Sequence, residues 1–283
     1  MKAFIFCCFF ISIIFSSNYE SNWRSLNSRP TPQWFKDAKF GIFIHWGLYS
    51  VPAWGPKGSY AEWYLNGLNN GDTARLRYHE QNYGKDFLYR DFINLFNPIN
   101  YDSDRWAELF KNAGAKYVVL TSKHHDGFCL WPNQQSKGYN SFDGIAGRDL
   151  LGELNKSVKE IGIRSGFYYS LYEWDHPDYP DNLSRYVNNY MIPQLKDAVQ
   201  RYSPDIIFSD GEWDRSSYEW KSEKFLAWLY NESNAPEDVV VNDRWGGETR
   251  FQHGGYFSTE YDPSSSQIDE NFITRGWEEC RGM

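Results

Sequence analysis

The sequence predicts an α/β fold of the (β/α)8 type, a TIM-type barrel. Short β-rich runs alternate with helical patterns along the chain, and this alternation predicts a parallel sheet with connecting helices. Almost every β-rich run also ends in a group of histidine, acidic, arginine or tryptophan residues. Reactive side chains at the carboxyl ends of many strands are typical of a barrel, whereas an open doubly wound sheet gathers them at one switch point.

The expected strands are short and rich in β-branched and aromatic residues. They lie at Phe40–Trp46, Tyr117–Ser122, Ser165–Leu171, Asp205–Ser209, Val239–Asn242 and Tyr256–Thr259. The helices expected between them have one apolar face and lie at Ser103–Ala113, Leu150–Ile161, Val187–Arg201 and Ser222–Tyr230. Six strands are fewer than an eight-fold barrel requires, so we expect either a barrel that is incomplete at its C-terminal end or last strands that are irregular. The long segment Tyr60–Phe96 is expected to shape a pocket.

The first residues predict a secretory signal peptide over residues 1–17. Lys2 supplies a positive charge, Ala3–Phe15 is an apolar run, and the small residues Ser16 and Ser17 follow. A membrane span needs about 20 apolar residues, so no stable membrane anchor is expected. Three N-glycosylation sequons are compatible with the secretory route, at Asn155, Asn182 and Asn231.

The composition favours a carbohydrate site. Of the 283 residues 19% are aromatic, and flat aromatic faces pack well against the C–H faces of sugars. The net charge of −8 argues against nucleic acid or an anionic membrane as a partner. The sequence contains no G-x-S-x-G elbow, P-loop, paired C-x-x-C motif or strand-associated G-x-G-x-x-G, so no metal or organic cofactor is expected. Once a signal peptide is removed, Cys129 and Cys280 are the remaining cysteines, and they either pair or stay as thiols.

Asp210 is the candidate nucleophile of a glycoside hydrolase, a reaction that needs two carboxyl groups. It follows the apolar run Asp205–Ser209 and precedes Gly211, so its carboxylate is expected to point into the mouth of the barrel. Helix or turn capping is the alternative role, and Glu212 and Asp214 are near enough to compete.

Three histidines and an arginine follow other expected strands. His45, His124 and His125 lack the further ligands of a zinc site, so we expect them to donate hydrogen bonds to substrate hydroxyls. Arg244 follows the fifth expected strand, where it contacts a sugar hydroxyl, holds a carboxylate ionised, or forms an ordinary salt bridge.

Several motifs together resemble the α-L-fucosidases of glycoside hydrolase family 29, of the animal tissue or lysosomal type. The resemblance extends from about residue 30 to the end of the chain. The motifs that carry it are Trp34–Trp46 (WFKDAKFGIFIHW), Ala61–Tyr64 (AEWY), Tyr117–Phe128 (YVVLTSKHHDGF), Gly166–Trp174 (GFYYSLYEW), Ser209–Trp213 (SDGEW) and Val241–Gly246 (VNDRWG).

The resemblance implies a fold, a reaction and a set of site residues. Asp210 matches the nucleophile of the family. The residues that match those around the fucose ring are His45, Glu62, Trp63, His124, His125, Tyr168 and Arg244. An apolar spot for the 6-deoxy methyl group is implied for Phe43, Tyr60 and Trp213. Phe208 departs from the pattern, since many relatives have tryptophan there.

The acid/base is less well defined, because it lies in a variable part of the family. Glu260 is preferred because its distance from Asp210 in the sequence matches that in the relatives best, and its neighbour Asp262 is a minor alternative. Glu278 is the other candidate, because Trp277–Cys280 matches a Trp-Glu-x-Cys signature segment of animal relatives. Relatives continue beyond this segment and add a C-terminal β-sandwich, so residues 18–283 are expected to be a truncated catalytic barrel without that sandwich.

The resemblance therefore implies a retaining exo-α-L-fucosidase that removes terminal α-L-fucose from glycoproteins, glycolipids or oligosaccharides through a covalent fucosyl–Asp210 intermediate. The alternative is a truncated, lectin-like relative that binds fucose without turnover. The expected partners are fucosylated glycans, and the expected location is the secretory route, either the lysosome or the extracellular space. A homo-oligomer is compatible with the sequence.

Overall fold

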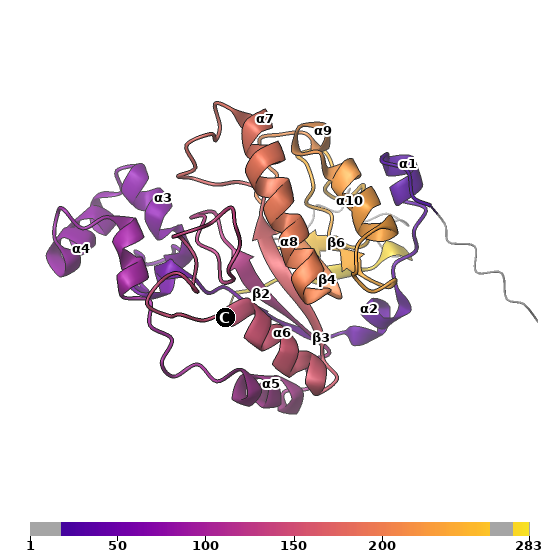
Figure 1. Ribbon diagram of the computed structural model, residues 1–283, viewed down its shortest axis with the longest axis horizontal. Helices are drawn as coiled ribbons and strands as arrows, with labels where there is room; N and C mark the ends of the chain where they lie inside the picture. The colour runs from indigo at the N-terminus through magenta and orange to yellow at the C-terminus, as the bar shows by residue number, and fades with distance from the viewer. Residues whose placement is uncertain (1–17, 261–273, 283) are drawn as a thin grey trace, which may run out of the picture.

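The protein, a computed structural model in which residues 18–260 and 274–282 are described, is built on a parallel sheet (Figure 1). Its five strands are neighbours in chain order: β1 (Gly41–Ile44), β2 (Tyr117–Lys123), β3 (Arg164–Ser170), β4 (Ile206–Asp210) and β5 (Val240–Val241). All four pairings are parallel, as the alternation of strands and helices predicts. Parallel neighbours have their carboxyl ends at one edge, so the residues that follow the strands meet there.

The sixth expected strand forms outside this sheet. β6 (Phe257–Thr259) pairs in parallel with β7 (Trp277–Glu279), which the sequence analysis does not identify as a strand. Within the described residues β1 and β5 are the outer strands of the five-stranded sheet. The α/β class and the parallel sheet are thus present.

Four helices cover one face of the sheet and match the predicted segments. They are α5 (Ser103–Asn112), α6 (Leu150–Glu160), α8 (Ile192–Tyr202) and α10 (Ser222–Asn231). In Figure 1 α6 and α8 lie in front of the strands, with α5 beside α6. Asp102 and Asp149 cap α5 and α6, because their carboxylates accept hydrogen bonds from the amides of Arg105 at 3.0 Å and Gly152 at 2.9 Å.

The predicted helix Val187–Arg201 is divided in two. Its first part, η4 (Val187–Met191), is a π-helical turn, and α8 follows with Pro193 in its first turn. Proline has no amide hydrogen for the bond to the carbonyl four residues back, and the wider turn before it accommodates that missing bond.

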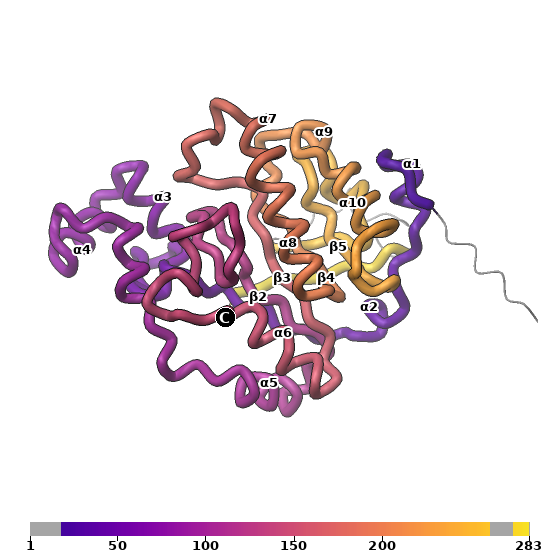
Figure 2. Tube along the Cα trace, viewed as in Figure 1, coloured from indigo at the N-terminus to yellow at the C-terminus, as the bar shows by residue number. Residues whose placement is uncertain are grey.

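The segment between β1 and α5 carries several short helices and extends away from the sheet, as the tube in Figure 2 shows. Its elements are η1 (Leu48–Ser50), η2 (Ala61–Trp63), α3 (Tyr64–Asn69), α4 (Thr73–Tyr83) and η3 (Tyr89–Asn94). The remaining short helices are α1 (Trp23–Leu26), α2 (Gln33–Ala38), α7 (Leu183–Tyr186) and α9 (Ser217–Trp220).

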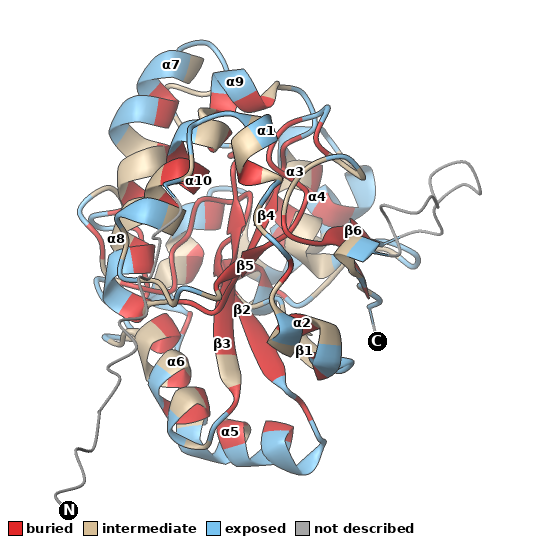
Figure 3. Ribbon diagram, turned by 90° about the vertical axis from the view of Figure 1, so that its right-hand side faces the viewer, coloured by how far each residue is buried: buried red, intermediate tan, exposed pale blue. Residues whose placement is uncertain are grey.

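Alternate residues of each strand face two different clusters of buried side chains. On β2, Val118 and Leu120 pack in the large cluster beneath the helices, whereas Tyr117 and Val119 belong to a smaller cluster on the other face, here called the inner face. Every residue of β2 is buried, and the strands form the buried centre of the molecule in Figure 3. Each such apolar side chain contributes roughly 1.5–3 kcal/mol to stability.

Candidate functional site

Asp210 lies on the inner face at the carboxyl end of β4. Ile206 and Phe208 belong to the inner cluster, and a strand turns every second residue to the same side, so Asp210 follows them. Gly211 comes next with a φ of 75°, and a Cβ atom at this position would lie 2.5 Å from the Cβ atom of Tyr172. Only glycine fits such a turn, which ends the strand directly after the carboxylate.

Three side chains surround the Asp210 carboxylate. The Arg244 guanidinium donates to Oδ1 at 2.9 Å, and the Tyr168 hydroxyl donates to Oδ2 at 2.8 Å. His125 Nε2 lies 3.6 Å from Oδ2. Burial alone would raise the pKa of Asp210. The electrostatic attraction of Arg244 and His125 and the hydrogen bond from Tyr168 together outweigh this effect, so the pKa of Asp210 is lower than its ordinary value. The buried carboxylate is therefore ionised at neutral pH, as a nucleophile requires.

Arg244 joins Asp210 to a second carboxylate. Its Nη2 donates to Glu260 Oε2 at 2.8 Å, and its Nε donates to the Ser258 hydroxyl at 2.9 Å. Arg244 is 2% exposed, whereas the side chain of Glu260 is 46% exposed. The buried Arg244 guanidinium thus binds two carboxylates through its two Nη atoms, the buried one of Asp210 and the accessible one of Glu260. Of the roles left open for Arg244, contact with a carboxylate is the one observed.

A third carboxyl group, Glu212, is buried next to this pair. It is 1% exposed, and neither of its oxygens has a hydrogen-bond partner among the described residues. Burial, followed by repulsion from Asp210, raises its pKa to about 7, against the opposing attraction of Arg244. Because its oxygens are covered, Glu212 does not compete with Asp210 for direct contact with a ligand. Asp214, the other residue considered as an alternative to Asp210, is exposed after the turn.

The two histidines that follow β2 reach the site because the strand has one extra residue. Thr121 pairs with Tyr168 and Lys123 with Tyr169, so two steps on β2 match one step on β3. Lys123 therefore lies on the helix side. His124 returns to the inner face and stacks on Tyr168, with ring centroids 5.5 Å apart and planes inclined by 12°.

Both of these histidines are neutral at pH 7. Burial lowers the pKa of His125 to about 4, although the Asp210 charge opposes it. Burial and the neighbouring His125 hold the pKa of His124 well below its ordinary value. His125 Nδ1 lies 2.5 Å from the Ser170 hydroxyl, which fixes the ring beside Asp210. His45 lies near His124, at 5.3 Å between ring centroids.

Aromatic rings form a wall around His125. Ring centroids of Trp174, Trp213 and Trp63 lie 5.1, 5.2 and 5.8 Å from its own, and Trp63 stacks with Trp213 at 6.1 Å. On the β1 side Phe43 stacks with His45 at 5.3 Å. These side chains place Asp210 and the neighbouring histidines among aromatic faces suited to the C–H surfaces of a sugar.

The structure brings most of the predicted site residues together, with exceptions. Tyr60 is 55% exposed and forms no ring contact with the described aromatic residues of this site. Glu62 lies beside Trp63 in η2, close enough to act electrostatically on His45. Asp262 lies outside the described residues, as does the predicted signal peptide.

Glu278 lies deeper than Glu260. It pairs with Ser258 across β6 and β7, so it lies one pleat below Glu260. It is 8% exposed and accepts hydrogen bonds at 2.8 Å from the Tyr117 hydroxyl, at the start of β2, and from the Cys280 thiol. Burial raises its pKa. Glu260 is therefore the candidate whose carboxylate reaches the accessible side of the site.

The sequence analysis does not find a buried ion pair that supports the site. Lys123 and Glu173 are almost completely covered, with 2.8 Å between Nζ and Oε2. The Lys123 ammonium also lies over the Tyr169 ring, 4.6 Å from its centroid. The pair joins the residue before His124 to the residue before Trp174. The sequence signal for this pair is a charged residue, Lys123, inside an otherwise apolar strand. The bulge changes which face of the sheet Lys123 occupies, so the sequence alone does not indicate that its ammonium is buried under the helices.

The other predicted positions are distributed over the surface and the core. Cys129 and Cys280 are free thiols. Asn182 is exposed, Asn155 is half-buried in α6, and the Asn231 side chain exchanges two hydrogen bonds with the backbone of Tyr19. In the part of the chain that the structure describes, no cluster of three histidine, cysteine or acidic residues could hold a metal ion. No helix in that part is both long and apolar enough to cross a membrane.

Comparisons with known proteins show which family the chain is similar to. A family model described as alpha-L-fucosidase matches residues 10–283. The chain is 42% identical to the alpha-L-fucosidase of Dictyostelium discoideum over 99% of this chain and 62% of the relative. It is 47% identical to the tissue alpha-L-fucosidase of Rattus norvegicus over 94% of this chain and 57% of the relative.

A solved structure is also similar, the alpha-fucosidase of Thermotoga maritima in complex with a mechanism-based inhibitor. The TM-score is 0.75 at 39% identity, and the match covers 87% of this chain and 60% of that chain. The present chain thus spans about three fifths of the length of these relatives. Because the family model matches nearly all of the chain and the identities are well above 30%, the chain belongs to the alpha-L-fucosidase family.

Proposed function

We propose that the protein is a retaining exo-α-L-fucosidase in which Asp210 is the nucleophile and Glu260 the acid/base. The observation that carries the proposal is the Arg244 guanidinium, which binds Asp210 through Nη1 and Glu260 through Nη2. A retaining glycosidase needs two carboxyl groups about 5–5.5 Å apart, on either side of the anomeric carbon. A shared guanidinium holds the two carboxylates near each other.

In the first step, an Asp210 oxygen forms a bond to the anomeric carbon of fucose while the bond to the leaving oxygen breaks. Glu260 gives its proton to that oxygen. Only Oε2 of Glu260 receives the Nη2 hydrogen bond, so a proton on Oε1 is compatible with the contact. In the second step Glu260 takes a proton from water, whose oxygen displaces Asp210 and releases fucose with retained configuration.

The side chains around Asp210 supply binding and electrostatics. The neutral imidazoles of His124 and His125 can exchange hydrogen bonds with sugar hydroxyls, as can Tyr168 and the neighbouring His45 and Glu62. Phe43 and the rings of Trp63 and Trp213 supply apolar surface for the methyl group and the C–H faces of fucose, and the resemblance assigns Tyr60 to the same apolar spot. Burying a methyl group contributes about 0.8 kcal/mol, which favours fucose over a sugar with a hydroxyl there.

The proposal extends to the whole protein. We take the parallel sheet as part of a (β/α)8 barrel, residues 18–283 as catalytic domain and residues 1–17 as a signal peptide. The substrates are then fucosylated glycans met in the secretory route, in the lysosome or outside the cell. Glycans on Asn182 and Asn155 would agree with that route, whereas one on Asn231 would require loss of its contacts with Tyr19.

The first experiment concerns the nucleophile. Asp210→Gly should abolish hydrolysis of an aryl α-L-fucoside, and added azide should restore part of the turnover because the small anion replaces the missing carboxylate. A 2-fluorofucosyl donor should label Asp210 in the wild type, as mass spectrometry of the peptides would show. Full activity of Asp210→Gly would refute the assignment. Binding of an iminosugar such as deoxyfuconojirimycin with no turnover of any fucoside would favour the lectin-like alternative.

The second experiment separates the acid/base candidates. Glu260→Gln should slow fucosides with poor leaving groups far more than a dinitrophenyl fucoside, whose leaving group needs no proton. Glu278→Gln is the matched control, and it should affect both substrates alike. A leaving-group dependence that appears in Glu278→Gln and is absent from Glu260→Gln would reverse the assignment.

A further inference from the structure

The Ser170 hydroxyl lies between two groups of the site. Ser170 is the last residue of β3, is completely buried and pairs in register with Asp210 on β4. Its Oγ lies 2.5 Å from the carbonyl oxygen of Tyr172 and 2.5 Å from Nδ1 of His125. A carbonyl oxygen can only accept a hydrogen bond, so the single hydroxyl hydrogen of Ser170 points to Tyr172. The hydroxyl oxygen is then left to accept a hydrogen bond from His125.

This arrangement places the ring hydrogen of His125 on Nδ1. Burial lowers the pKa of His125 to about 4, so the ring is neutral at pH 7 and carries one N–H group. Because Nδ1 donates that hydrogen to Ser170, Nε2 has a free lone pair. The Trp174 amide donates to the His125 carbonyl at 2.8 Å, which fixes the backbone that carries the ring. His125 therefore presents an acceptor to the site.

Nε2 of His125 faces a second acceptor. It lies 3.6 Å from Oδ2 of Asp210, which is longer than a hydrogen bond. An ionised carboxylate and an unprotonated ring nitrogen both only accept, so neither can donate to the other. Below about pH 4 the ring gains a second hydrogen and attracts Asp210 as a cation. At neutral pH this pair of acceptors needs a hydrogen from a ligand, and a hydroxyl group supplies one.

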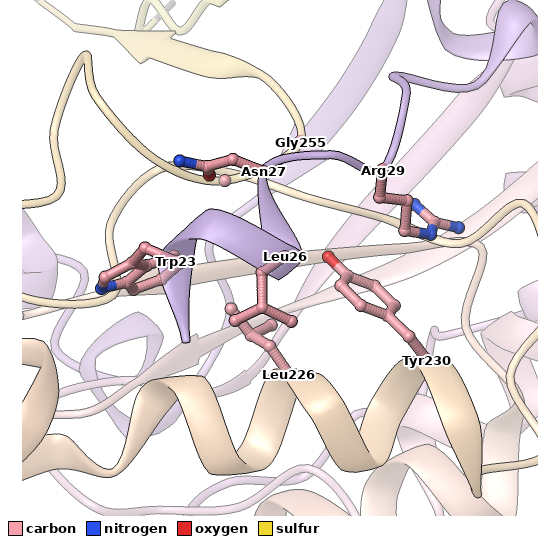
Figure 4. A pocket seen from close by; sticks show the side chains of 8 residues that line it. Trp23, Leu26, Asn27, Arg29, Leu226, Tyr230 and Gly255 are labelled. Carbon is pink, nitrogen blue, oxygen red and sulfur yellow. The ribbon is translucent and has the colours of Figure 1, made fainter. Parts of the chain in front are cut away.

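His253 has the opposite arrangement, far from the site. Asn27, the C-cap of α1, lines the small cavity between α1 and α10 that Figure 4 shows. Its Oδ1 accepts a hydrogen bond from Arg275 Nη1 at 3.2 Å, so its Nδ2 is the atom that donates to His253 Nδ1 at 2.9 Å. Burial, followed by the charge of Arg275, lowers the pKa of His253. This ring is thus also neutral at pH 7, and it carries its hydrogen on Nε2.

We propose that Ser170 is a positioning residue that keeps the ring hydrogen of His125 on Nδ1, so that Nε2 accepts a hydrogen bond from a hydroxyl group of the bound fucose. The inference rests on the proposed function, and it reverses the donor role that the sequence analysis expects for His125. The site then selects this hydroxyl group by its hydrogen and rejects a group of similar size that has none. Without Ser170 the hydrogen can move to Nε2, which would then donate to Asp210.

NMR of the wild type tests the first half of the proposal. In a two-dimensional ¹H–¹⁵N spectrum, a ring nitrogen that carries a hydrogen and one that does not differ clearly in ¹⁵N chemical shift. The chain has six histidines, so a sample labelled at histidine gives few signals, and His125→Gln identifies those of His125. At pH 7 His125 should carry its hydrogen on Nδ1 and His253 on Nε2. A hydrogen on Nε2 of His125 would overturn the proposal.

Two serine variants test the role of Ser170. Ser170→Ala should move the hydrogen of His125 to Nε2 in part or all of the molecules and leave His253 unchanged. Ser165→Ala, the same substitution at a buried position near the other end of β3, is the matched control and should change neither ring. A His125 signal in Ser170→Ala that is the same as in the wild type would refute the positioning role.

Binding of fluorinated sugars tests the acceptor role. Fluorine resembles a hydroxyl group in size but has no hydrogen to donate, so L-fucose is compared with its 2-, 3- and 4-fluoro derivatives by tryptophan fluorescence. At one of the three positions, the loss of affinity caused by fluorine should be about 10-fold smaller in Ser170→Ala than in the wild type, the expected worth of one hydrogen bond. Ser165→Ala should keep all three wild-type losses. Losses that are the same in Ser170→Ala and the wild type would overturn the acceptor role.

These measurements keep the inference separate from the proposed function, because none of them requires turnover. If the wild type hydrolyses no fucoside but shows the expected His125 signals and the fluorine effect that depends on Ser170, the hydrolase is refuted and the role of Ser170 stands. If the wild type hydrolyses fucosides with the hydrogen of His125 on Nε2, the role of Ser170 is refuted and the hydrolase stands.

Discussion

Replacing Glu212 by glutamine should stabilise the folded protein progressively as the pH rises. The pKa of Glu212 is raised from 4.5 to about 7, by burial first and by the Asp210 charge second. Between these two pH values the unfolded chain has lost the proton and the folded protein still holds it. The folded state then binds more protons, so the free energy of unfolding of the wild type falls as the pH rises through this window.

The magnitude follows from the width of the window. Each pKa unit is worth about 1.4 kcal/mol, so the stability that the wild type loses between pH 4.5 and 7 is about 3 kcal/mol. Glutamine has nearly the same shape and no proton to lose. The stability of Glu212→Gln relative to wild type should therefore increase by about 3 kcal/mol from pH 4.5 to pH 7.5.

Urea unfolding followed by tryptophan fluorescence, at half-unit steps from pH 4.5 to 7.5, measures this difference. Glu108→Gln, on the exposed side of α5, is the control and should give a difference that does not depend on pH. In an Asp210→Asn background the effect of Glu212→Gln should shrink, because one cause of the raised pKa is gone. A stability difference that stays constant over this pH range would show that Glu212 is ionised in the folded protein.

Two further predictions concern the groups around β2. Lys123→Met should lower the free energy of unfolding by about 3–5 kcal/mol, because it leaves the Glu173 carboxylate buried without its partner. Adding Glu173→Leu to this variant should recover part of that loss. If thermal unfolding shows that the losses of the two single variants add up in the double variant, the pairing is contradicted. The His125 imidazole should stay neutral from pH 5.5 to 8, with an NMR titration midpoint near pH 4. A midpoint close to 6.5 would show that burial does not control this ring.

Much of the fold follows from local sequence patterns. Period-two alternation in β4 places Ile206, Phe208 and Asp210 on one face, and the strand observed there agrees with the predicted one to within a residue. The order of strands and helices predicts the parallel sheet, and aspartates at the predicted helix starts act as caps. These features depend on neighbours in the sequence, which is why they can be predicted from it.

Other features depend on contacts between distant segments and could not be predicted. Glu212 is buried in the turn after β4, and this turn contacts the segment that follows Arg244, where the Gly247 amide donates to the Arg215 carbonyl. The pairing of β6 with β7 joins residues about 20 positions apart through a segment without a clear pattern. The depth of Glu278 relative to Glu260 follows only from that pairing, so the sequence alone left both as acid/base candidates.

The extra residue in β2 separates two kinds of chemistry that are adjacent in the sequence. Ser122 lies between the matched pairs Thr121–Tyr168 and Lys123–Tyr169. If Ser122 were paired with Tyr169, every later residue would change sides. The Lys123 ammonium would then lie on the inner face, and the His124 ring would enter the apolar layer under the helices. The unpaired serine therefore keeps an ammonium under the helices and an imidazole on the inner face, although the two residues that carry them are consecutive.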